Sequence, residues 1–293
     1  MSRPKGAKNI VPFGQRTAVQ SSPSAMIKHL AAGAQQCALD AFVDLLKHQT
    51  NYIKWILTRH EALQNAKAGA SRGGPKDVTF NKYKWYAEHL LLLEAINAFE
   101  VFFKRTVVHL GAAISPYVPA DRVKGNIDAR ILWTAPNSSS ASDLIFESRL
   151  YHDLDVIDQA TDSLVQAKRY NKNSPPPAMR TMVRGLQAIF QIRHTLSHNH
   201  GLLTASDAGK LRLLNFSVKT GEVVDPTRDN FGVAIRSAMR SEAKDFTVWL
   251  LARTAAYLQD VHQNAGLELN RDTLAAIESH IGKDAALSAL PWA

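Results

Sequence analysis

One long apolar stretch, residues 79–112, constrains the fold more than any other part of the chain. Its middle, HLLLLEAINAFEVFF, is apolar almost all the way round when it is drawn as a helix of about 100° per residue. A helix that is apolar on every side needs other elements on every side. We therefore expect this helix to lie at the centre of the fold.

A few polar residues interrupt this helix, and they gather on one side of it. They are Glu94, Asn97, Glu100, Lys104 and Arg105. One interpretation is an internal ladder of ion pairs, because Glu100 and Lys104 have the i, i+4 helical spacing. The other interpretation is a polar wall that faces an active-site groove. Both are compatible with the sequence.

Several other segments repeat apolar residues at three- and four-residue steps, as expected on the buried face of a helix. These segments are residues 24–68, 142–150, 151–170, 178–200, 229–265 and 270–290. Residues 210–226 instead favour strands, and Thr220-Gly221 within them is a turn sequence. The sequence thus predicts an all-α protein, a bundle of long helices with a small β-hairpin insertion.

The chain divides into three parts by composition. Residues 1–24 hold basic residues and no acidic residue, so we expect a flexible basic arm. Residues 25–265 form the predicted helical domain, and residues 266–293 a C-terminal helix that packs on the same domain. Formal charge is +9 and the pI is about 9.6, which favours a polyanionic partner such as nucleic acid. Lys5, Lys8 and Arg16 are the arm residues that we expect to contact RNA phosphates.

The cysteine count and the lengths of the apolar runs indicate in which cellular compartment the protein is expected. Cys37 is the one cysteine, which excludes an internal disulfide. The N-terminal residues contain no apolar run of signal-peptide length, and no apolar run is long enough to span a bilayer. We therefore expect a cytoplasmic protein that makes no contact with a membrane.

The stretch RHTLSHNHG, residues 193–201, concentrates one arginine and three histidines at the predicted end of a helix. The first interpretation is a metal site, in which His194 and His198 share a helical face and His200 adds a third ligand. The second is a plain cationic helix end that opposes the helix dipole, capped by Gly201.

The third interpretation is acid–base chemistry on an RNA phosphodiester. Cleavage by the neighbouring 2′-hydroxyl needs a group that exchanges protons near neutral pH, which imidazole does. It also needs a cation that stabilises the charge on phosphorus, and the guanidinium fork fits phosphate oxygens. The motif on this basic protein holds both groups, and this chemistry requires no metal or other cofactor.

The same residues resemble the active-site motif of the HEPN superfamily, in which an arginine is followed after four to six residues by a histidine. Arg193 and His198 match it with four intervening residues, and His194 fills the polar position after the arginine. Asn199 and Gly201 resemble the family's H-N-x-G continuation. The resemblance covers about residues 25–265 and rests on these few positions.

The resemblance implies a metal-independent endoribonuclease that works as a homodimer, with two motifs meeting across one cleft. It implies that His198 transfers protons, that Arg193 binds the scissile phosphate, and that His194 orients it. Glu100 or Glu94, in a stretch that resembles an earlier HEPN helix, is an accessory candidate. The implied role is toxin-like or antiviral, with RNA or tRNA as substrate and Asn199 as an RNA contact, and it admits an inhibitory or activating protein partner.

Two questions stay open in the sequence. His200 follows Arg193 after six residues, so it also fits the motif spacing. On a continuous helix, Arg193 and His198 point about 140° apart, whereas Arg193 and His200 nearly share a face. The alternative function is a catalytically inert HEPN-like module that binds RNA or protein, and a metal-dependent hydrolase is a third candidate.

Overall fold

The computed structural model describes residues 36–67, 77–125, 130 and 141–293. The chain separates into two compact units, Met1–Gln36 and Cys37–Ala293, and the second unit contains all the elements below. The predicted boundary after residue 24 and the basic arm lie outside the described residues. Within the described part, no helix is both long and apolar enough to cross a membrane.

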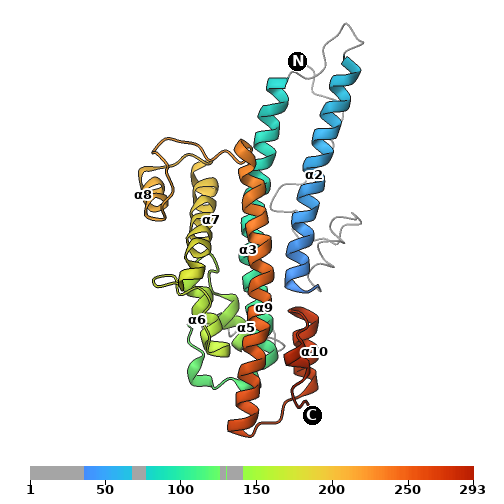
Figure 1. Ribbon diagram of the computed structural model, residues 1–293, viewed down its shortest axis with the longest axis vertical. Coiled ribbons are helices and arrows are strands. Elements are labelled where there is room, and N and C mark those ends of the chain that lie inside the picture. The colour runs from blue at the N-terminus through green and yellow to red at the C-terminus, as the bar shows by residue number, and fades with distance from the viewer. Residues whose placement is uncertain (1–35, 68–76, 126–129, 131–140) are drawn as a thin grey trace. The chain divides into compact units, whose positions relative to one another are not determined.

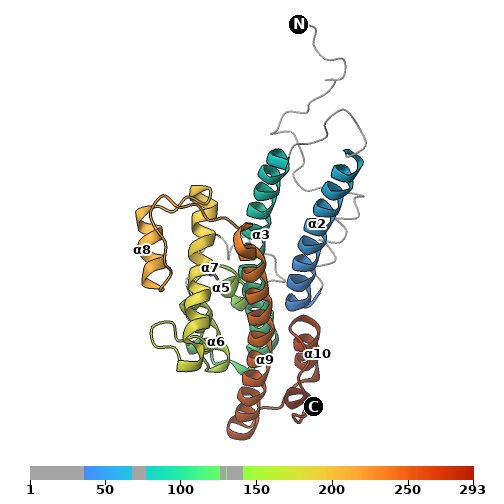
Figure 2. The same cartoon turned by 45° about the horizontal axis from the view of Figure 1, so that its top comes forward.

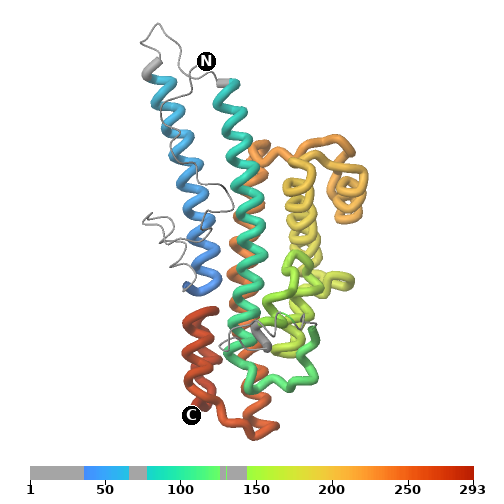
Figure 3. Tube along the Cα trace, turned by 180° about the vertical axis from the view of Figure 1, so that it is seen from behind, coloured from blue at the N-terminus to red at the C-terminus, as the bar shows by residue number. Residues whose placement is uncertain are grey.

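Helix α3 (Asp77–Ile114) lies at the centre of the second unit, as its sequence predicts. Helix α9 (Phe231–Ala265) runs beside it, and the two share neighbours on opposite sides (Figures 1 and 3). The helices that pack against α3 on either side are α2 (Ala38–Lys67), α5 (Ala141–Glu147), α6 (Leu154–Val165), α7 (Arg180–Asn199) and α10 (Arg271–His280). The all-α bundle predicted from the sequence is therefore confirmed for the described residues.

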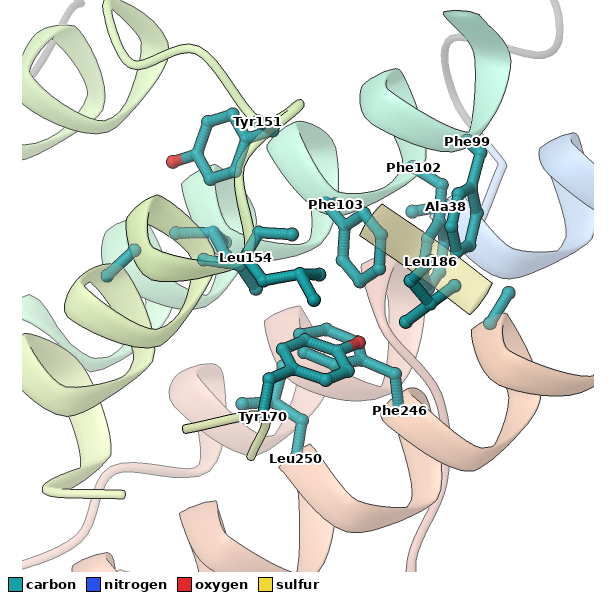
Figure 4. Packing of buried hydrophobic residues seen from close by; sticks show 14 of the residues in the cluster. Ala38, Phe99, Phe102, Phe103, Tyr151, Leu154, Tyr170, Leu186, Phe246 and Leu250 are labelled. Carbon is teal, nitrogen blue, oxygen red and sulfur yellow. The ribbon is translucent and has the colours of Figure 1, made fainter. Parts of the chain in front are cut away.

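Aromatic side chains from α3 and α9 form the middle of the core (Figure 4). Phe103 is fully buried, and its ring lies 4.6 Å from Phe99 and 4.9 Å from Phe246, between centroids. Tyr170, also fully buried, stacks on Phe246. Rings at these separations add favourable contacts beyond the burial of their area. This packing fixes the position of α3 relative to the helices around it.

The predicted β-hairpin over residues 210–226 is wrong. Residues Ala205–Leu213 form helix α8 instead, which lies alongside α7 (Figure 2). The Thr204 side chain accepts a hydrogen bond from the Asp207 backbone, and the Asp207 side chain accepts one in return from the Thr204 backbone, so a capping box starts the helix. The predicted turn at Thr220-Gly221 does form, but the chain after it pairs with residues 201–203.

The C-terminal segment is two short helices and not one. Asn270 caps α10 as predicted, but α10 ends at His280. Gly282 then adopts a φ of 149°, and Asp284 caps a separate helix, α11 (Ala285–Ser288). Helix α10 packs on α3, and α11 packs on α9. Short 3-10 turns at Ser115–Tyr117, Ala120–Arg122, Pro177–Met179 and Arg228–Asn230 connect the longer helices.

Candidate functional site

The motif occupies the C-terminal end of α7, as predicted. The buried face of α7 repeats at helical spacing through Val183, Leu186, Phe190 and Leu196. Because these side chains face the core, the intervening motif residues lie on the outer sides of the helix. Arg193 is half-buried, and His194 and His198 are exposed.

The helix stops at His200, which is its C-terminal cap. His200 has a φ of 49° and Gly201 a φ of 87°, so two consecutive residues adopt left-handed backbone, and the Gly201 amide donates to the Thr195 carbonyl. The helical projection that brings Arg193 and His200 onto one face is therefore wrong, because the helix ends before His200. His200 instead acts electrostatically on the buried His89 of α3.

His89 is buried beneath this cap. Burial lowers the pKa of His89, the charge of His200 lowers it further, and a hydrogen bond with the Leu196 backbone opposes both effects. The ring also lies near Gly201, because a Cβ placed on that glycine would meet His89 Cε1 at 3.5 Å. These contacts indicate that a neutral imidazole of α3 supports the end of α7.

Arg193 reaches across to α3. Its Nε donates to Asn97 Oδ1 at 3.1 Å and lies 3.3 Å from Glu100 Oε1. Both contacts use Nε, so Nη1 and Nη2 take part in no hydrogen bond between described residues. The guanidinium is thus anchored at one edge while its two amino groups are available to a ligand.

Glu100 is the residue that connects the elements of the site. It is 15% exposed, and its Oε2 lies 3.9 Å from Nδ1 of His152, in the loop before α6. Burial raises the pKa of Glu100, and the charges of Arg193 and His152 both oppose that rise. A single carboxylate of α3 therefore faces one cation from α7 and one imidazole from a distant loop.

The polar residues of α3 contact different neighbouring helices, and Glu100 and Lys104 do not pair with each other. Lys104 lies 3.8 Å from Glu147 of α5, and Glu94 accepts a hydrogen bond from Gln49 of α2. Only Asn97 and Glu100 of the five polar residues are shown in contact with the motif. Of the two accessory candidates, Glu100 contacts Arg193 of the motif, whereas Glu94 bonds to Gln49 of α2.

The two motif histidines lie together on the outer side of α7. Their ring centroids are 4.7 Å apart, and His194 Nε2 lies 4.0 Å from Oδ1 of Asp207 in α8. Asp207 is buried, which raises its pKa, but hydrogen bonds from Thr204 and Asn199 and the charge of His194 lower the pKa below the ordinary value. The buried carboxylate of Asp207 therefore lies next to the His194 imidazole.

Asn199, predicted to contact RNA, has a partner inside the protein. Its Nδ2 donates to Asp207 Oδ2 at 3.0 Å, and Gln191 Nε2 donates to the other oxygen at 2.8 Å. These bonds tie the last turns of α7 to the first turn of α8. The predicted arm contacts Lys5, Lys8 and Arg16 lie outside the described residues.

Sequence reasoning missed His152 and Asp207. The Thr204-x-x-Asp207 spacing of a capping box was present in the sequence and could have identified Asp207. His152 carries no such signal, since only the packing of its loop brings it to Glu100.

Among the described residues, no group of three or more His, Cys, Asp or Glu side chains is placed to hold a metal ion. The metal interpretation of the histidine cluster therefore has no ligand set in this part of the chain. Comparison of the chain with protein-family models, with curated proteins and with solved structures found no match.

Proposed function

We propose that the protein is a metal-independent endoribonuclease of the HEPN type, cleaving RNA by attack of the 2′-hydroxyl on the adjacent phosphate. The observation that carries the proposal is the anchoring of Arg193. Asn97 and Glu100 hold Nε, while Nη1 and Nη2 make no hydrogen bond to a described residue at an exposed helix end. A guanidinium in this state can offer two parallel donors to a phosphate.

The motif histidines supply the proton chemistry in this proposal. His198 is exposed and makes no ion pair with a described residue, so its imidazole is available to take a proton from the 2′-hydroxyl. His194 lies beside it, backed by the carboxylate of Asp207, and orients the phosphate. The products are a 2′,3′-cyclic phosphate and a 5′-hydroxyl.

The proposal extends to assembly and biological role. Residues five apart on a helix point about 140° from each other, so we expect that one chain does not bring Arg193 and His198 to a single contact. A homodimer in which the ends of two α7 helices face one another places both on one phosphate. The role we propose is toxin-like or antiviral cleavage of RNA, tRNA included, in the cytoplasm, with the basic arm adding affinity.

A second candidate is an inert module of the same kind that binds RNA or protein. Two contacts favour it: Glu100 pairs with Arg193, and Asn199 bonds to Asp207. A site whose polar groups are partly satisfied internally is also what a purely structural helix end would have. The two candidates differ in whether bound RNA is cut.

The test is cleavage of total cellular RNA by the purified protein in excess EDTA. We expect cleavage in EDTA, and a loss of about 10²- to 10⁴-fold in rate for Arg193→Ala and for His198→Ala. Arg253→Ala, an exposed arginine of α9, is the matched control. Binding of RNA without cleavage by the unaltered protein would favour the inert module. Activity lost in EDTA and restored by a divalent ion would favour a metal-dependent hydrolase.

Two further measurements refine the proposal. If His200→Ala removes activity and His198→Ala does not, His200 is the catalytic histidine. Analytical ultracentrifugation should show a dimer, and a strict monomer that cleaves RNA would contradict the shared cleft.

A further inference from the structure

A groove of about 590 Å³ opens beside the motif, between the loop before α6, α7 and α8. Its volume lies in the usual range of ligand sites. Two imidazoles line it, His194 from α7 and His152 from the loop, and both are close to half exposed. His198 does not line it. The groove therefore brings His194 of the motif near His152, which lies about forty positions earlier in the chain. Only the packing of the helices and the loop determines this proximity.

The groove offers one lysine without an ion pair to a described residue, and apolar surface, to a nucleotide. Lys172 and Lys210 line it, and Lys172 is held by Asp153 and Asp155 at 2.9 and 3.1 Å. Lys210 of α8 is exposed and forms no ion pair with a described residue, so its charge is available to a phosphate. Leu213, 83% exposed, adds apolar surface against which a base can lie.

His152 lies next to two carboxylates. Glu100 Oε2 is 3.9 Å from its Nδ1, and the charge of His152 also acts on the neighbouring Asp153. Glu100 also contacts Arg193, so the His152 imidazole and the phosphate-binding guanidinium share one anchoring residue.

Cleavage of RNA through its 2′-hydroxyl needs two proton transfers. A base takes the 2′-hydroxyl proton as the 2′ oxygen bonds to phosphorus. The bond between phosphorus and the 5′ oxygen then breaks, and an acid gives that oxygen a proton. The motif provides an imidazole as the base, and water restores both groups afterwards. On this scheme a second, protonated group has to reach the leaving oxygen.

We propose that this groove holds the RNA strand beside the scissile phosphate and that His152 is the general acid that protonates the 5′ oxygen. This role of the groove and of His152 rests on the proposed endoribonuclease activity. Within it, Arg193 binds the phosphate, His198 is the base, and Lys210 binds a neighbouring phosphate. His152 is 42% exposed, so its replacement leaves the core untouched.

The test compares two RNA substrates in single-turnover cleavage by the full chain. One is ordinary RNA, and the other carries sulfur in place of the 5′ oxygen at the cleavage site, because a thiolate leaves without a proton. We expect His152→Ala to cut ordinary RNA about 10²-fold or more slowly and the sulfur substrate at a rate near that of the unaltered protein. We expect His198→Ala to be slow on both substrates.

The outcomes separate this inference from the proposed function. If the unaltered protein and the Arg193→Ala variant behave as proposed while His152→Ala cuts ordinary RNA at full rate, the inference alone fails. It also fails if His152→Ala is equally slow on the sulfur substrate, because the loss then comes from binding or structure. If the unaltered protein cuts neither RNA, the proposed function itself fails.

Binding tests the groove independently of the chemistry. Lys210→Ala should flatten the dependence of RNA affinity on salt by about 0.7 in log–log slope, the value for one phosphate of a single strand. Lys244→Ala, an exposed lysine of α9 that does not line the groove, should leave the slope unchanged. Equal slopes for the two variants would place the RNA elsewhere.

Discussion

Two arginine–glutamate pairs in this protein have the same chemistry and opposite surroundings. Arg169 and Glu242 meet at 2.8 Å, Tyr170 donates to the same carboxylate, and the glutamate is 4% exposed. Arg193 and Glu100 meet at 3.3 Å, and Glu100 Oε1 is buried without a hydrogen bond among the described residues. A fully bonded pair holds the fold together, whereas an incompletely bonded pair keeps capacity for a ligand.

The first test of this difference between the two pairs is to remove one charge from each. Glu242→Gln should lower the free energy of unfolding by about 3 kcal/mol, because it leaves the mostly buried Arg169 without its counter-charge. Glu100→Gln should lower it by less than about 1 kcal/mol, because Arg193 is more exposed and keeps its bond to Asn97. Urea denaturation of both variants measures the difference, and equal losses would contradict it.

A second comparison concerns Asp207, the anion behind His194. Thr204→Ala removes a hydrogen bond to Asp207 and the cap of α8, and should lower the free energy of unfolding by about 1 kcal/mol. Because those bonds lower the pKa of Asp207, the variant should also titrate this carboxyl at higher pH. NMR titration of the carboxyl carbons follows the change. Ser206→Ala, in the same turn and exposed, is the control and should alter neither quantity.

The smallest expected effect is a pH dependence at Glu100. Its folded pKa is raised above the ordinary value of 4.5, so its contribution to stability is present at low pH and is lost as pH rises through the folded pKa. Arg193→Ala removes one charge that lowers the pKa of Glu100 but leaves Glu100 buried. The pKa of Glu100 should therefore rise further, and the loss of stability should extend to higher pH. Unfolding free energies measured from pH 4 to 7 test this, and an unchanged profile would mean that Arg193 does not act on Glu100.

The long helices were predictable because their patterns are local. The apolar circumference of α3 predicted its central position, and the motif was correctly placed at the end of α7. The strand interpretation of residues 210–226 failed because a capping box at Thr204 outweighed the apolar residues that follow it. Local chemistry at the helix start was the better signal there.

The composition of the site was only partly predictable. Glu100 was a candidate because its stretch resembles an earlier HEPN helix, but its partners Arg193 and His152 are fixed by tertiary packing. The face shared by Arg193 and His200 was inferred by extending a helix that in fact ends at a left-handed residue. A single residue in that conformation redirects every side chain after it.

The separation of Asn97 and Arg193 by 96 residues has a consequence for the protein as it is synthesised. The ribosome makes Glu100 long before Arg193, and a carboxylate cannot be buried at low cost without its counter-charge. That side of α3 therefore stays hydrated until α7 has been translated. A nascent chain that stalls before residue 193 lacks the Arg193 guanidinium that would bind phosphate. This cation is therefore present only after most of the chain has been synthesised.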